Sequence, residues 1–585
     1  LMEALAAGET PSPELVASAG GCGKLSMVGG GALLIAIIAG LILIALADRR
    51  VRLSERLELR LPPQVLEHQA RSIIEGLGYT DPPRDRARGF GWRHDLLQVI
   101  EENDSSAERW QRLGEEGADV LRFWYRQSPR LMIPDTDSGR LLVWKPPVIQ
   151  PGMVSVTLTS TGRLATFQAV PPRRTRAEGK PAELDWSIAL EAAGFQPEQL
   201  EAAEPSVTPL TACDRRVAWS APHPTLEGVR QRIDAASFQG RPVSFLVHET
   251  WTLPGRAGGS TRSFFAAMSD WAYNILLFIA LVGGIWFAWS NISQGRGDRR
   301  GATRVAVYYL LLSSIVWLLT ADHVSDAAGE IVLLVRALSR ALFHAMLAWF
   351  LYVALEPTVR RIWPRKLVSW NRLLSGRLRD PLVGRDLLLG IAAGVATTLV
   401  LRLHYLAVGW LGAPPPRPLG MGLDFLLGPR HVIGKILWLH AEAALGAVIG
   451  VFIFVAALTV AKRPWVGLAI LLVVGIARIP YGVVSDLLAV DICFRALAVA
   501  CLLAGIQIGL LGLAAGLFTH FLLESSVLSL NPDAWYSASG LTAAAVLIGF
   551  ALVDALCACR GRSGFPAPAP AAPPLSAAGL EPGKR

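Results

Sequence analysis

Long apolar runs dominate the chain, and one extended polar stretch interrupts them. Residues 27–47 carry no charged side chain over about 20 positions, which is the length that an α-helix needs to cross a bilayer. Similar runs recur from about residue 271 and predict about eight further spanning helices, near 271–289, 305–321, 332–355, 387–411, 432–460, 465–485, 492–520 and 539–557. The pattern therefore predicts a polytopic α-helical membrane protein with about nine spans.

The polar stretch, residues 51–262, has a different periodicity and predicts an α+β region outside the membrane. Pro62–Tyr79 has the apolar spacing of an amphipathic helix and ends in GLGY. Met153–Val170 alternates apolar and polar residues around Thr161-Gly162, which is the pattern of a β-hairpin. A second helix near Trp186–Ala193 ends in AAGF and is again followed by strand-like segments, so we expect a weak internal repeat.

These patterns divide the chain into five segments. They are a flexible linker (1–26), a transmembrane helix (27–47), the α+β region (48–265), a multi-span membrane domain (266–558) and a Pro/Ala-rich tail that we expect to be disordered (559–585). The first residue is Leu1, and no signal segment opens the chain. We therefore expect the sequence to be a fragment of a longer protein.

Composition agrees with the membrane prediction. The chain is 52% hydrophobic and has a mean hydropathy of +0.40, which soluble globular proteins rarely reach. The net charge of +9 arises from basic residues in short loops between apolar runs, where membrane topology and anionic lipid explain it. We expect the lipid bilayer as a partner of these residues, and no nucleic acid.

One basic loop, Glu356–Asp386, sets the expected orientation of the protein. Short loops rich in basic residues stay on the cytoplasmic side because such residues resist translocation. Basic, acidic and basic loops alternate along 290–304, 322–330 and 356–386, which places 48–265 outside and 1–26 inside. We expect a topology anchor that faces lipid, formed by Arg360, Arg361, Arg365, Lys366, Arg372, Arg377, Arg379 and Arg385.

Several charged or polar side chains fall within predicted spans, where burial in hydrocarbon is costly. The candidate intramembrane polar cluster consists of Arg336, Arg340, His344, His440 and Glu442, and further polar positions are Arg402, His404, Lys435, Arg478, Asp486, Asp491 and Arg495. A polar pathway or an acid–base site is one interpretation. Side chains that reach the interface or pair to lock the helices are the interpretation that we favour. His440 and Glu442 are two residues apart, so they point to different faces of a helix.

The sequence assigns no catalytic, cofactor-binding or metal-binding residue. HExxH and GxSxG motifs are absent, and the six cysteines lack the spacing of a zinc site or a disulfide framework. A stand-alone polytopic transporter or permease-like protein remains an alternative function, as does a membrane hydrolase of unrecognised type.

Several long motifs resemble one protein family. They are YVALEPTVRRIWPRKLVSWNRLLSGRLRDPLVGRD (Tyr352–Asp386), LAAGETPSPELVA (Leu5–Ala17), GLGYTDPP (Gly76–Pro83), FWYRQSPR (Phe123–Arg130), and PGMVSVTL with GRLATFQAVPP between Pro151 and Pro172. Together they resemble the membrane and sensor region that follows the kinase domain in large bacterial receptor-like serine/threonine protein kinases of the acidobacteria type. The succession of a helix and antiparallel strands also looks like extracytoplasmic modules of the PepSY type, which bind partners.

This resemblance implies that the chain is the membrane anchor and signal-input portion of such a kinase, in the bacterial inner (plasma) membrane. The kinase motifs themselves, including HRD, DFG and APE, are absent from this sequence, so no phosphoryl-transfer residue is carried over. ATP and Mg²⁺ would belong to that cytoplasmic kinase domain, and this chain has no expected cofactor. The implied partners are the kinase domain in cis and an extracytoplasmic ligand or protein.

Overall fold

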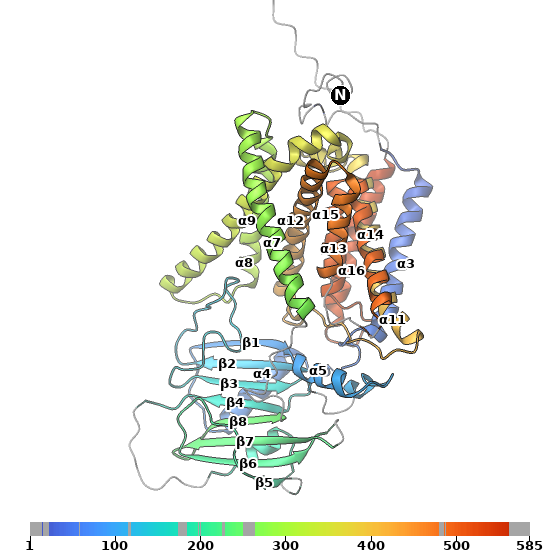
Figure 1. Cartoon of the computed structure of the whole chain (residues 1–585). Coiled ribbons are helices and arrows are strands. Elements are labelled where there is room, and N and C mark those ends of the chain that lie inside the picture. The colour runs from blue at the N-terminus through green and yellow to red at the C-terminus, as the bar shows by residue number, and fades with distance from the viewer. Residues whose placement is uncertain are drawn as a thin grey trace, which may run out of the picture.

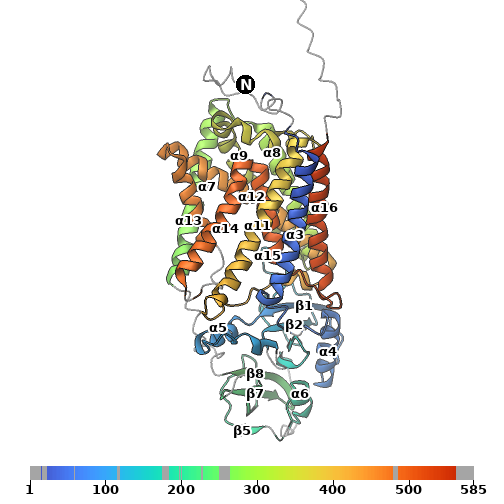
Figure 2. The ribbon, with the colours of Figure 1, turned by 90° about the vertical axis from the view of Figure 1, so that its right-hand side faces the viewer.

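The computed structural model describes residues 15, 23–57, 59–114, 119–173, 184–196, 198, 200–224, 228–249, 264–478, 485 and 487–560. A bundle of helices stands on a β-sheet region (Figures 1 and 2). The end of the bundle next to the sheet is called the sheet-side end here, and the opposite end is the distal end. Most of the expected linker and the tail beyond Arg560 lie outside the described residues.

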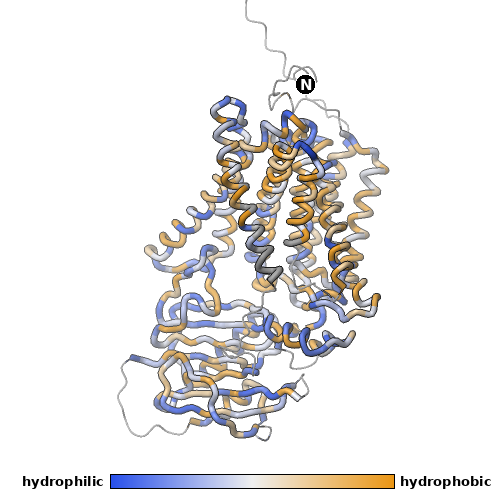
Figure 3. The backbone as a smooth tube through the Cα atoms, in the orientation of Figure 1, coloured by the Kyte–Doolittle hydropathy of each residue, from blue (hydrophilic) through white to orange (hydrophobic). Residues whose placement is uncertain are grey.

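The helices confirm a polytopic helical membrane protein. Among the described residues, seven are long and apolar enough to cross a bilayer: α3 (Met27–Val51), α8 (Arg299–Thr320), α9 (Ala327–Ile362), α11 (Pro381–Trp410), α12 (Pro429–Ala461), α14 (Leu488–Ile508) and α16 (Ser537–Cys559). Accompanying helices are α7 (Phe264–Ser293), α13 (Pro464–Arg478) and α15 (Leu510–Ser525). Apolar residues run along these helices, and hydrophilic residues gather at the distal end and in the sheet region (Figure 3).

The prediction of one helix over 492–520 is wrong, because the chain turns at Gly509 between α14 and α15. Gly509 has a φ of 140°, and a Cβ at this position would lie 2.6 Å from the Lys366 carbonyl oxygen. Only glycine fits a backbone with that φ and that close an approach. The flanking sequence is apolar on both sides, so hydropathy gives no sign of the turn.

The basic stretch 356–386 is mostly helical. The helix α9 continues through Pro357 to Ile362, and the short helices η3 (Pro364–Lys366) and α10 (Val368–Leu374) follow it. Pro357 has no N–H for the Val353 carbonyl. The Asn291 amide of α7 donates to that carbonyl oxygen at 3.1 Å instead, which removes part of the cost of a proline inside a helix.

The sheet region contains one antiparallel sheet of eight strands in the order β1-β2-β3-β4-β8-β7-β6-β5. The strands are β1 (Asp85–Trp92), β2 (Leu121–Ser128), β3 (Val154–Thr159), β4 (Leu164–Ala169), β5 (Glu201–Ala203), β6 (Arg215–Pro222), β7 (Arg230–Phe238) and β8 (Arg241–Glu249). The expected hairpin around Thr161-Gly162 is confirmed as β3–β4, with Gly162 at a φ of 89° in the turn.

The sheet consists of two halves that meet at its centre. Each half is a helix, α4 (Pro63–Gly76) or α6 (Ser187–Ala192), followed by four strands, and both helices lie on the same face of the sheet (Figure 2). The halves join through β4 and β8, which pair only from Thr166↔Leu246 to Gln168↔Ser244. The seam between the halves is therefore shorter than the strand pairs within them, except for β5–β6, which is equally short.

The edge strand β1 lies nearest to the bundle, and loops from the helices cover it (Figure 1). Trp92 Nε1 donates to the Met421 carbonyl oxygen at 3.4 Å, and Trp535 stacks on Phe90 with ring centroids 6.4 Å apart. One hydrophobic core continues from the bundle into the sheet region. Covering an edge strand prevents it from pairing with other chains, and here it also fixes the sheet region to the bundle.

Candidate functional site

A cavity of about 540 Å³ opens in the sheet region where β4 and β8 part. Beyond the Thr166↔Leu246 pair these strands are no longer hydrogen-bonded, although β8 stays paired with β7 as far as Glu249. Both halves of the sheet line the cavity, which we call the seam cavity. Its volume is in the range of small-molecule sites in proteins, about 300–1,000 Å³.

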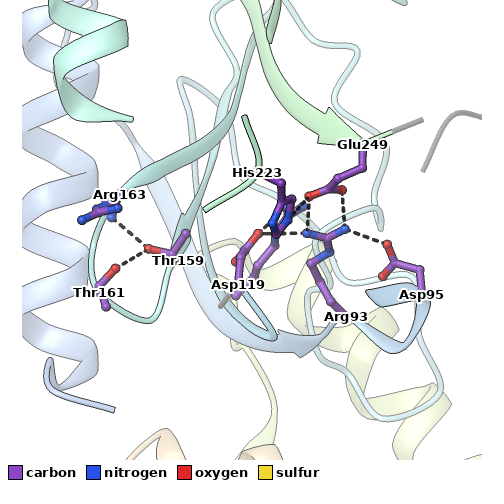
Figure 4. Close-up of polar contacts among 9 residues, drawn as sticks. Arg93, Asp95, Asp119, Thr159, Thr161, Arg163, His223 and Glu249 are labelled. Atoms are coloured by element: carbon purple, nitrogen blue, oxygen red, sulfur yellow. Dashed lines mark hydrogen bonds and ion pairs between the residues drawn. The ribbon is translucent and has the colours of Figure 1, made fainter. Parts of the chain in front are cut away.

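A buried ion pair joins the two halves at one wall of this cavity (Figure 4). Arg93 follows β1 in the first half, and Glu249 ends β8 in the second. Arg93 Nη2 lies 2.7 Å from Glu249 Oε2, and Nη1 lies 3.2 Å from Oε1, which is a bidentate arrangement. Asp119 Oδ2 lies 3.3 Å from Arg93 Nη1, and His223 Nε2 lies 3.6 Å from Glu249 Oε1.

Arg93 and Glu249 both remain charged near neutral pH. Burial alone would raise the pKa of Glu249, but the hydrogen bond from His223 and the charge of Arg93 hold that pKa well below its usual range. Burial would likewise lower the pKa of Arg93, and the neighbouring Glu249 and Asp119 raise it instead. Neither group exchanges a proton near neutral pH, so the pair serves binding and cohesion and does not suit acid–base catalysis.

Hydroxyl groups and guanidinium groups face the cavity from the first half of the sheet. On the β3–β4 turn, Thr159 Oγ1 lies 2.9 Å from Thr161 Oγ1 and accepts from the Arg163 backbone N–H at 3.1 Å (Figure 4). Arg122 of β2 also lines the cavity and donates to Asp119 Oδ2 at 2.7 Å. Such a surface suits a polar ligand with oxygen acceptors.

The helix α5 (His94–Asn103) connects the seam cavity with the bundle. Arg93 is the residue that immediately precedes this helix, and Glu101 near its end accepts from Arg417 at 2.5 Å. Arg109 and Trp110 then donate to the Pro415 carbonyl oxygen at 2.6 Å and 2.8 Å. Arg417 and Pro415 belong to the connection between α11 and α12, so α5 links the ion pair to the bundle in addition to the direct contact of Trp92 with Met421.

A second buried ion network lies at the sheet-side end of the bundle. Arg402 of α11 donates to Asp48 of α3 at 2.7 Å and to Glu524 of α15 at 2.7 Å. Arg52 lies 3.3 Å from Asp48 and donates to the carbonyl oxygens of Gly420, Leu523 and Glu524. Asp48, Arg52 and Arg402 are fully buried, so this network ties three helices to the loop that contacts α5.

Sequence reasoning identified Arg402 as a polar position within a span but did not identify its partners. Asp48 and Glu524 each stand at the end of an apolar run, where a carboxylate ordinarily reaches water. The same holds for His404, whose Nε2 lies 2.7 Å from Asp491 of α14. A lone acid at the end of one span and a lone base within another is the only sequence signal for such pairs.

The five residues of the candidate intramembrane polar cluster are not brought together as one site. Arg336 is exposed and pairs with Asp135 of the sheet region at 3.2 Å. His344 stacks on Tyr309, and His440 lies edge-on against Tyr308. Arg340 lies over the Trp438 ring, and Glu442 is exposed. Within the described residues no ion pair links any two of Arg336, Arg340, His344, His440 and Glu442.

The eight basic residues expected to face lipid have different environments. Arg360 and Arg372 are buried, and they pair with Glu356 at 3.1 Å and with Asp380 at 2.9 Å. For these two the expectation is wrong, because a neighbouring carboxylate draws each guanidinium into the helix packing. Lys366 and Arg385 are half-buried, and the exposed members are Arg361, Arg365, Arg377 and Arg379.

Comparison with known proteins finds no matching family model, no matching curated protein and no matching solved structure. Within the described residues no group of three or more His, Cys, Asp or Glu side chains is placed to hold a metal ion. The seam cavity and its connection to the bundle are therefore the structural features from which a function is proposed below.

Proposed function

We propose that the chain is a membrane-embedded signal-input module, in which the sheet region binds a polar ligand on the extracytoplasmic side of the membrane and the bundle transmits the change. The observation that carries this proposal is the seam cavity itself. It lies between two half-sheets that share only a three-residue seam, and the ion pair at its wall adjoins the helix that contacts the bundle. A ligand that alters the spacing of the halves would move α5.

The proposed topology has ten membrane crossings, by α3, α7, α8, α9, α11, α12, α13, α14, α15 and α16. An even number of crossings places the start of α3 and the end of α16 on the same side of the membrane. In agreement, the Leu25 N–H donates to the Ala558 carbonyl oxygen at 3.0 Å, beside Gly384. The exposed arginines 361, 365, 377 and 379 lie at this same distal end, which supports a cytoplasmic location.

Single-cysteine labelling in intact cells tests this topology. In a parent chain whose six native cysteines, Cys213 of the sheet region among them, are replaced by serine, the substitutions Asp137→Cys and Ser375→Cys place one thiol in the sheet region and one in the basic stretch. We expect a membrane-impermeant maleimide to label residue 137 in intact cells, and residue 375 only after permeabilisation. The reverse pattern would overturn the orientation, and with it an extracytoplasmic sheet region.

The output that we propose is a cytoplasmic serine/threonine kinase domain in cis. The resemblance of Tyr352–Asp386 to the membrane region of receptor-like kinases supports this, and that stretch lies at the distal end with Leu25. The reading frame upstream of the Leu1 codon provides the direct test. An in-frame kinase domain with HRD and DFG motifs would support the proposal. A start codon close to Leu1 would contradict it.

Ligand binding in the seam cavity is tested by thermal shift with a panel of small polar metabolites. A matched pair of variants separates the cavity from the rest of the surface: Thr161→Trp fills the cavity, whereas Thr208→Trp adds the same side chain at an exposed site outside it. We expect a metabolite that raises the Tm of the parent and of Thr208→Trp but not of Thr161→Trp. Equal shifts in both variants would place the binding elsewhere.

A further inference from the structure

A second cavity, of about 290 Å³, lies at the boundary between the bundle and the sheet region. Its walls are the sheet-side parts of α8, α9 and α12, and the loop Asp137–Arg140 of the sheet region closes it. We call it the boundary cavity. It is distinct from the seam cavity, which lies within the sheet.

The loop that closes the boundary cavity is held against the bundle. The Leu141 N–H donates to Asp322 Oδ2 at 2.8 Å, and the Asp322 N–H donates to the Gly139 carbonyl oxygen at 2.9 Å. Gly139 has a φ of 71°, and a Cβ there would lie 3.2 Å from Trp317 Nε1. A ligand in this cavity would therefore touch both regions of the protein at once.

Three basic side chains line the boundary cavity, Arg140, Arg340 and Lys435, against two acidic ones, Asp137 and Asp424. Arg140 pairs with Asp424, and the Lys435 ammonium lies 3.9 Å from the other oxygen of the same carboxylate. Arg340 lies with its guanidinium carbon 4.9 Å from the centre of the Trp438 ring. The ion pairs found among the described residues include none with Arg340. The site thus retains positive charge that an anion can neutralise.

Two uncharged hydrogen-bond donors also line this cavity. The Ser313 hydroxyl and the Trp317 indole N–H line the cavity, are shielded from solvent, and have no hydrogen-bond partner among the described residues. Buried donors without a partner are rare because each one costs free energy. A ligand with several anionic oxygens, such as a phosphate ester, would satisfy these donors together with Arg340 and Lys435.

The helices beside the cavity present apolar side chains outward. Leu311, Ile315 and Leu318 are exposed on α8, and Leu338, Leu342 and Phe343 are exposed on α9. In a membrane-spanning bundle such faces contact acyl chains. We infer that the boundary cavity binds the phosphate headgroup of an anionic phospholipid, whose acyl chains lie along α8 and α9. The headgroup would then join the sheet-region loop to the bundle.

Native mass spectrometry and thermal unfolding of the full chain test this inference. The protein is placed in nanodiscs of phosphatidylcholine alone or with phosphatidylglycerol, and in a third arm inorganic phosphate is added to phosphatidylcholine discs. We expect phosphatidylglycerol to be retained and to raise the Tm, whereas inorganic phosphate has no such effect. A rise with inorganic phosphate alone would identify a soluble phosphate site and overturn the lipid assignment.

The variants Arg340→Gln and Lys435→Gln remove one charge each from the cavity. Arg336→Gln is the matched control, since Arg336 lies one turn away on α9, is exposed and pairs with Asp135 outside the cavity. We expect each cavity variant to weaken phosphatidylglycerol retention about tenfold, as the loss of one charge-assisted contact implies, and the control to bind as the parent does. Equal retention by all three variants would overturn the inference. If one cavity variant fails to fold, the other still decides the question.

Discussion

At the scale of residues, the buried ion network at the sheet-side end of the bundle depends on each charged group keeping its partner. Arg402 balances Asp48, which is fully buried, and Glu524, which is half-buried. Removing one partner of a buried ion pair leaves an uncompensated charge, which destabilises proteins by roughly 3–5 kcal/mol. We therefore expect Arg402→Met to lower the Tm in detergent strongly, and the additional change Asp48→Asn to recover part of the loss.

The matched control for this prediction is Arg336→Gln, since Arg336 forms an exposed ion pair worth about 0–1 kcal/mol. Thermal unfolding followed by tryptophan fluorescence gives the comparison. If Arg402→Met unfolds at the same temperature as Arg336→Gln, the network does not stabilise the bundle.

The ion pair of the seam cavity makes a pH-dependent contribution. The pKa of Glu249 in the folded chain is held below the value of 4.5 of a free glutamate, because His223 and Arg93 outweigh burial. Its contribution to stability is therefore complete above pH 4.5 and is lost as the pH falls below that value. We expect the Tm of the sheet region to fall on acidification, and Glu249→Gln to reduce that slope while lowering the Tm near neutral pH. The same slope in Glu249→Gln would show that other groups cause it.

At the scale of elements, α11 and α15 approach so closely that only glycine fits between them. A Cβ at Gly390 would lie 2.4 Å from the Gly512 carbonyl oxygen, and a Cβ at Gly394 would lie 2.4 Å from that of Gly516. Each helix thus contributes two glycines four residues apart, which is a small-residue packing face of membrane helices.

We expect Gly394→Leu to force these helices apart and to cost about 1–3 kcal/mol or more, since overpacking displaces backbone. Gly549→Leu is the control, because a Cβ at Gly549 meets no atom within 4 Å. The Tm values of Gly394→Leu and Gly549→Leu in detergent test this prediction. Similar values for both variants would contradict close packing of α11 on α15.

Elements with a continuous pattern could be predicted from the sequence, and those that depend on a single residue or a distant partner could not. The apolar helices and the β3–β4 hairpin follow directly from periodicity. The turn at Gly509 lies inside one long apolar run, so hydropathy averages over it. The seam cavity depends on where β4 and β8 stop pairing, and these strands lie far apart along the chain. No local sequence pattern indicates where the pairing of β4 with β8 ends.

At the scale of the whole molecule, the sheet region and the bundle are joined by side-chain contacts that follow one another in space. The seam cavity adjoins Arg93, α5 carries Glu101 to Arg417, and the α11–α12 connection reaches the network of Arg52 and Arg402. The proposal of a signal-input module therefore requires that a change at the seam cavity alters hydrogen–deuterium exchange of backbone amides in the bundle.

Hydrogen–deuterium exchange of the full chain in nanodiscs, with Glu249→Gln, measures this coupling most directly. Glu201→Gln is the control, because Glu201 also lines the seam cavity but forms an exposed pair with Arg230. We predict faster exchange in α5 and in the connection 411–428 for Glu249→Gln, and parent-like exchange there for the control. Faster exchange confined to β8 and its neighbouring strands, with 411–428 unchanged, would contradict transmission from the cavity to the bundle.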